Sequence, residues 1–75
     1  MYKYVAYSDV RIKTPHVEKF SDIKISIEQT ADRVYMHEEF PNGLILDIYQ
    51  YADRIEYTSN KRIIADENLS LTFED

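Results

Sequence analysis

The chain contains no cysteine and no tryptophan, and it has only one glycine and two prolines among 75 residues. Without cysteine, disulfides, thiol nucleophiles, iron–sulfur clusters and thiolate zinc sites are excluded, as is typical of a reducing compartment. One glycine cannot build a loop that cradles phosphate. No apolar run approaches the roughly 20 residues of a membrane span, and the first residues lack a signal peptide's apolar segment. We therefore expect a cytoplasmic protein with no membrane partner.

The length predicts a single domain over residues 1–75, because a chain of this size hides only about 60% of its unfolded surface in one core. A hydrophobic content of 44% with 31% charged residues indicates a folded chain. Nine basic and fourteen acidic residues give a net charge of −5. Only Lys61 and Arg62 are adjacent basic residues, whereas phosphate-backbone binding needs basic clusters. We expect no direct nucleic-acid partner, and a protein partner that is basic.

Alternation of apolar and polar residues with a period of two predicts strands along most of the chain. The alternating apolar positions include Tyr2, Tyr4, Ala6, Val10 and Ile12, then Ile23, Ile25 and Ile27, and finally Leu69, Leu71 and Phe73. Tyr, Ile, Val, Phe and Thr are abundant, which favours strands over helices. The sequence therefore predicts an all-β fold.

The strongest local signal is the corner at residues 41–43, Pro-Asn-Gly. A two-residue Asn-Gly turn would place Glu38 opposite Asp47, an unfavourable like-charge pair. A three-residue loop with a left-handed Gly43 instead pairs Phe40 with Leu44. This register predicts a core face with Val34, Met36, Phe40, Leu44, Leu46 and Ile48. The opposite face then pairs Arg33 with Tyr51, Tyr35 with Tyr49, His37 with Asp47, and Glu39 with Ile45.

The rest of the chain predicts a small antiparallel meander that closes into a barrel or roll. The apolar residues fall on even positions at Leu44, Leu46 and Ile48 but on odd positions at Ile55 and Tyr57. This change indicates a turn near residues 52–53. A hairpin is expected to join 55–58 to 62–65, and residues 66–68 to turn into the last strand. Thr14 and Pro15 predict a short helical turn near 15–20. An α+β alternative places a longer helix within 16–31 on the sheet, although the β-branched isoleucines there disfavour it.

Seven tyrosines form the most suggestive surface feature, since Tyr and Arg are enriched at protein interfaces. We predict a partner-binding face made of Arg33, Tyr35, His37, Asp47, Tyr49, Tyr51, Asp53 and Glu56. Two other interpretations are open: Tyr2, Tyr4 and Tyr7 of the N-terminal strand could cover this face, or the rings could stack single-stranded bases. The surrounding carboxylates disfavour the second, because base-stacking platforms lie in basic grooves.

The chain offers little catalytic equipment, so we expect no catalytic residues, no cofactor and no metal. Adjacent Glu38 and Glu39 point to opposite sides of a strand and cannot share a proton. His37 with Glu39 and Asp47 is the one grouping that suggests a small metal-dependent enzyme. A hydrogen bond from His37 to Asp47, with a raised histidine pKa, is the simpler interpretation.

These observations favour a small acidic non-catalytic protein-binding module, and specifically an inhibitor that occupies a basic nucleic-acid-handling site of another protein. In gross composition the chain resembles small acidic host-takeover and anti-defence proteins of bacteriophages. The alternative is a structural subunit of a homo-oligomer or larger particle, joined through a strand edge or the tyrosine face.

Overall fold

A computed structural model describes residues 1–74, which form strands and one 3-10 turn. The strands are β1 (Tyr2–Ala6), β2 (Arg11–Ile12), β3 (Lys24–Gln29), β4 (Val34–Glu39), β5 (Ile45–Gln50), β6 (Ile55–Ser59), β7 (Arg62–Ala65) and β8 (Ser70–Glu74), and the turn η1 is Phe20–Asp22. The fold is all-β, as the alternating pattern predicts.

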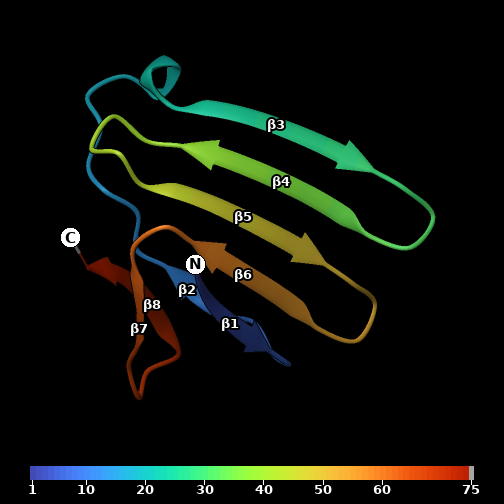
Figure 1. The fold of residues 1–75 in the computed structure, drawn as a ribbon. Coiled ribbons are helices and arrows are strands. Elements are labelled where there is room, and N and C mark those ends of the chain that lie inside the picture. Colours follow the sequence, from blue (N-terminus) through green and yellow to red (C-terminus); the bar gives the residue numbers. More distant parts are fainter. Residues whose placement is uncertain (75) are drawn as a thin grey trace.

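The strands form two sheets, seen in Figure 1 as a long sheet and a short group near the N-terminus. The larger sheet has the order β1-β6-β5-β4-β3 and is antiparallel throughout. The smaller has the order β2-β8-β7, in which β2 runs parallel to β8. The larger sheet stays open, with β1 and β3 at its edges, so the predicted closure into a barrel is wrong.

The β4–β5 hairpin has the predicted register, with Tyr35 opposite Tyr49 and His37 opposite Asp47. Gly43 adopts φ 91°, the left-handed conformation that the three-residue loop requires. Its N–H donates to the Phe40 carbonyl at 3.0 Å, and the Phe40 N–H donates to the Leu44 carbonyl at 2.9 Å. The turn chemistry therefore fixes which side chains lie on each face.

The predicted hairpin between residues 55–58 and 62–65 is wrong, because β6 pairs with β5 and β1 while β7 pairs with β8. The chain passes from one sheet to the other at Asn60 and Lys61. The Asn60 side chain accepts the Ile45 N–H at 2.8 Å and donates to the Gly43 carbonyl at 2.9 Å. The sequence predicts a hairpin turn at this point. The Asn60 side chain instead bonds the segment between β6 and β7 to the β4–β5 corner.

The helical turn falls at Phe20–Asp22 and not at 15–20. The chain after β2 is held by the Lys13 N–H, which donates to the Leu71 carbonyl at 2.9 Å and continues the β2–β8 pairing. Residues 24–29, which the α+β alternative assigns to a helix, form β3 instead. The β-branched isoleucines of this segment suit the strand.

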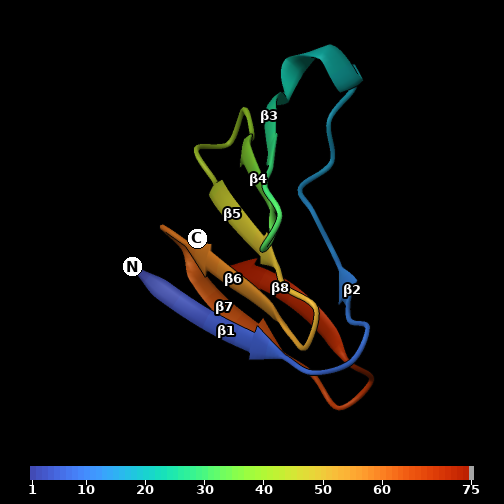
Figure 2. The same cartoon turned by 90° about the vertical axis from the view of Figure 1, so that its right-hand side faces the viewer.

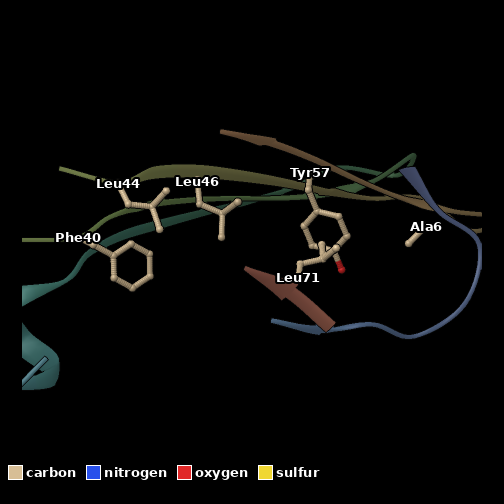
Figure 3. Close-up of a cluster of buried hydrophobic side chains, with 6 residues drawn as sticks. All are labelled: Ala6, Phe40, Leu44, Leu46, Tyr57 and Leu71. Atoms are coloured by element: carbon tan, nitrogen blue, oxygen red, sulfur yellow. The ribbon is translucent and has the colours of Figure 1, made fainter. Parts of the chain in front are cut away.

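The core lies between the two sheets, where Figure 3 shows side chains of the larger sheet pointing toward Leu71 of β8. Its buried apolar members are Ala6, Phe40, Leu44, Leu46, Tyr57 and Leu71. Phe40, Leu44 and Leu46 belong to the predicted core face, and Ile48 packs against them. Val34 and Met36 share that face but are only half-buried, since they lie toward β3.

Candidate functional site

The side of the larger sheet that points away from the second sheet carries the predicted partner-binding residues. We call it the outer face, and the side bearing Leu46 the inner face. Across the strands, one row of the outer face contains Glu28, Tyr35, Tyr49 and Glu56, and the next contains Ser26, His37, Asp47 and Thr58. Figure 2, which views the larger sheet from another side, shows β1 continuing it beside β6. The interpretation that the N-terminal strand covers the tyrosines is therefore wrong.

Tyr35 and Tyr49 form a stacked pair at the centre of the outer face, with ring centroids 4.8 Å apart and planes inclined by 25°. The Arg33 guanidinium carbon lies 5.2 Å from the centroid of Tyr49 and 5.9 Å from that of Tyr35. Both distances fall within the range of cation–π contacts. The three side chains form one half-buried platform whose rings are held by cross-strand pairing.

Asp47 lies beneath this platform as a shared hydrogen-bond acceptor and is only 8% exposed. Its Oδ1 accepts the Tyr35 hydroxyl at 2.6 Å and lies 2.6 Å from His37 Nδ1. The other imidazole nitrogen, Nε2, lies 3.1 Å from Glu39 Oε2. Asp47 therefore orients Tyr35 and His37 and is not itself presented to solvent, in contrast to the predicted surface carboxylate.

These contacts move two pKa values in directions set by the carboxylates. The hydrogen bond to Asp47 raises the pKa of Tyr35 to about 12, because ionising the phenol would place two negative charges together. Hydrogen bonds to Asp47 and then to Glu39 raise the pKa of His37, since the charged imidazolium can donate to both. The raised histidine pKa agrees with the interpretation from the sequence.

A second cluster lies where β5 turns into β6. The Arg54 guanidinium lies 4.1 Å from the Tyr51 ring centroid. Its Nε donates to Glu56 Oε2 at 2.7 Å and its Nη1 to Asp53 Oδ1 at 2.9 Å. Lys3 of β1 completes the cluster, with Nζ 2.8 Å from Glu56 Oε1. The Lys3 contact, followed by that of Arg54, lowers the pKa of Glu56.

The structure thus brings all eight predicted residues to the outer face or the turn that borders it. Two of their three carboxylates, however, have little exposed surface: the Asp47 and Glu56 side chains are 12% and 15% exposed, against 74% for Asp53. Asp47 is buried, and Glu56 is held by Lys3 and Arg54, two residues that the sequence analysis missed. Arg54 could have been found from its spacing, because it precedes Glu56 by two residues, and residues two apart in extended chain point to the same side. The Lys3 contact depends on β1 pairing with β6, which no local pattern indicates.

The grouping of His37, Glu39 and Asp47 exists, but as a hydrogen-bonded chain. Each imidazole nitrogen faces a carboxylate oxygen, so neither nitrogen is directed at an open position. Among residues 1–74, no group of three or more His, Cys, Asp or Glu side chains is placed to hold a metal ion. The arrangement can hold a proton and orient a tyrosine.

Within the same described residues, no helix has the length and apolar character needed to cross a membrane. Comparisons with protein-family models, with curated proteins and with solved structures found no match to this chain. Any function of the outer face must therefore be inferred from its own side chains.

Proposed function

We propose that the chain is a non-catalytic protein-binding module and that the outer face is its contact surface. The observation that carries this proposal is the platform of Tyr35 and Tyr49 under Arg33. Tyrosine rings supply broad contact area with few rotatable bonds, and Tyr and Arg are the residues most enriched where binding energy concentrates. Asp47 fixes Tyr35 before any partner arrives, which lowers the entropy lost on binding.

The contact surface extends from the platform to the β5–β6 turn. Tyr51 and Arg54 stack there, and Asp53 projects into solvent with 74% of its side chain exposed. A hollow beside them is lined also by Asp9 and by Tyr7, a residue that is 79% exposed. A side chain of a partner that entered this hollow would meet two tyrosines, two aspartates and Arg54.

The chemistry of the partner follows from charge. The chain carries −5 overall, so its long-range field attracts a basic protein. We assign the partner to the class with basic nucleic-acid-handling sites, which the module would occupy as an inhibitor in the manner of phage host-takeover and anti-defence proteins. Asp53 and Glu39 supply the local contacts: each has a partner in the chain, Arg54 or His37, but their side chains are 74% and 44% exposed. The side chains of Glu56 and Asp47 are only 15% and 12% exposed.

Affinity capture with the tagged chain tests this proposal. A protein that is retained by the wild type should be released when the salt concentration rises to about 0.5 M, because screening weakens charge attraction. Heparin, a polyanion that fills basic grooves, should release it at low salt. Capture that resists both treatments would overturn the assignment to a basic site, and equal capture by a Tyr49→Ala Tyr51→Ala variant would overturn the assignment to the outer face.

A further inference from the structure

β3 is an edge strand of the larger sheet. All six residues of this strand are exposed, and within residues 1–74 no strand pairs with its outer edge (Figure 1). Edge strands are ordinarily protected by proline, bulges, short length or charged side chains, especially lysine. β3 has no proline and no glycine, and it pairs with β4 without a bulge along its whole length. Its two charged residues, Lys24 and Glu28, are of opposite sign, so they repel a second strand only where like charges meet. It is therefore an available template for another strand.

The direction of the free backbone groups follows from the hairpin geometry. The Thr30 N–H donates to the Arg33 carbonyl, so in this antiparallel ladder the even-numbered residues of β3 direct their backbone groups toward β4. The N–H and C=O groups of Ile25, Ile27 and Gln29 then point away from the sheet. Any added strand must pair with these three residues.

The side chains of β3 are complementary to a second copy of the same strand running the other way. With Ser26 on a twofold axis, Lys24 of each copy lies opposite Glu28 of the other, and Ile25 lies opposite Ile27. Opposite charges and β-branched apolar pairs directly across antiparallel strands are the favourable combinations. The Ile25–Ile27 pairs are also the ones whose free backbone groups face each other, so each can exchange both N–H···O=C bonds.

We propose that two copies of this chain associate through antiparallel pairing of their β3 strands, in the register that places Ser26 on the twofold axis. The two five-stranded sheets then form one continuous sheet. Ile25 and Ile27, which are 37% and 63% exposed, meet their counterparts on the inner face, while the Lys24–Glu28 pairs lie on the outer face.

Neighbouring registers lose these pairs. An axis at Ile25 places Asp22 opposite Glu28, a like-charge contact, and an axis at Ile27 places Lys24 opposite Thr30. A shift by one residue would mix inner-face with outer-face side chains. At the other edge of the sheet, Lys3 is the only charged residue of β1, so β1 cannot form a self-complementary charge pair. The self-complementary pairing of charges is therefore possible at the β3 edge and not at the β1 edge.

This dimer stands independently of the proposed function and leaves the outer-face platform uncovered. The β4 strands of the two copies would be separated by three strand spacings, about 14 Å. Two platforms would then lie on the same side of one sheet, which would raise the avidity for a partner that presents two contact sites.

Sedimentation equilibrium of the untagged full chain tests the association. The wild type should shift from monomer to dimer as concentration rises. Lys24→Glu should weaken dimerisation about tenfold or more, because it sets two like-charge pairs at the interface. Lys24→Glu combined with Glu28→Lys should restore it, while Lys13→Glu, at an exposed site outside β3, should leave it unchanged. A wild type that stays monomeric at its highest soluble concentration would overturn the proposal.

A cysteine crosslink tests the register and does not depend on charge. The chain has no cysteine, so Ser26→Cys introduces a single thiol. At a non-hydrogen-bonded pair on the axis, the two Cα atoms would be about 4.5 Å apart, within disulfide range. Gln29→Cys is the matched control, because it is exposed, leaves the Lys24–Glu28 pairs intact and would place its copies about 20 Å apart. Rapid oxidation of Ser26→Cys alone to a covalent dimer supports this register, whereas equal rates for both variants would refute it.

Discussion

Tyr35 stacks on Tyr49 across the β4–β5 ladder, and the Arg33 guanidinium lies over both rings. The pair couples stability to the proposed contact surface, because the same two rings pair across the strands and form the centre of that surface. Variants of these residues must therefore be measured for unfolding as well as for binding.

Tyr49→Ala should lower the free energy of unfolding by about 1 kcal/mol, because it removes one cross-strand aromatic pair but leaves the core intact. Urea denaturation followed by circular dichroism checks this value. Tyr2→Ala is the control, since Tyr2 is half-exposed at the start of β1 and makes no ring contact in the described structure. A Tyr49→Ala protein without cooperative unfolding would show that the ring belongs to the core.

The phenol of Tyr35 should ionise late. Its pKa is raised to about 12 by the hydrogen bond to Asp47, so Asp47→Asn should return its ionisation toward the ordinary value near pH 10. Because the folded-state pKa is the higher one, this interaction stabilises the fold fully below about pH 10 and is lost as pH rises toward 12. Phenolate absorbance during an alkaline titration follows it. An identical titration in Asp47→Asn would contradict the assigned hydrogen bond.

His37 should make the fold less stable as pH rises above about 6.5, the ordinary pKa of histidine. The carboxylates of Asp47 and Glu39 raise its pKa in the folded state, so the contribution is fully present below the unfolded value of about 6.5. It is lost as pH passes through the raised folded-state value, because neutral imidazole donates to only one carboxylate. Chemical denaturation across this range should show the loss in the wild type and in His16→Gln. If His37→Gln shows the same loss, the contribution comes from elsewhere.

Gly43→Ala should destabilise the hairpin by about 1 kcal/mol. A Cβ at Gly43 meets no atom within 4 Å, so the cost comes from φ 91° alone, which L-residues rarely adopt. Thermal unfolding measures the change, and Gly43→Asn, which tolerates the left-handed conformation better, should cost less. Equal losses for the two substitutions would argue against a backbone cause.

The sequence predicts strand register best where the turn residues and the cross-strand side-chain pairs require the same register. At the β4–β5 hairpin the left-handed Gly43, the aromatic pair and the His37–Asp47 pair all require one register, and the structure has it. The β6–β7 prediction fails because alternation identifies a strand without identifying its neighbour. The chain leaves the larger sheet at Asn60, whose side chain bonds to the β4–β5 corner, a contact that alternation does not indicate.

The candidate site shows the same limit. The alternation along the strand correctly places Asp47 on the outer face, but it does not indicate how deeply a side chain is buried. Asp47 is buried because Tyr35 and His37 both converge on its Oδ1, an arrangement of rotamers that no spacing encodes. The engagement of Glu56 likewise depends on Lys3, which lies more than fifty residues away in the chain and reaches it only through the β1–β6 pairing.

The most direct test of the outer face as contact surface is to measure unfolding and partner capture on the same Tyr49→Ala Tyr51→Ala protein, beside a Tyr2→Ala control. We expect the double variant to unfold cooperatively, with a melting temperature about 4 to 16 °C lower, as for a loss of about 1 to 2 kcal/mol in a small domain. It should also lose the captured protein. The control should keep it. A folded double variant that captures the same protein as strongly as the wild type would contradict the account.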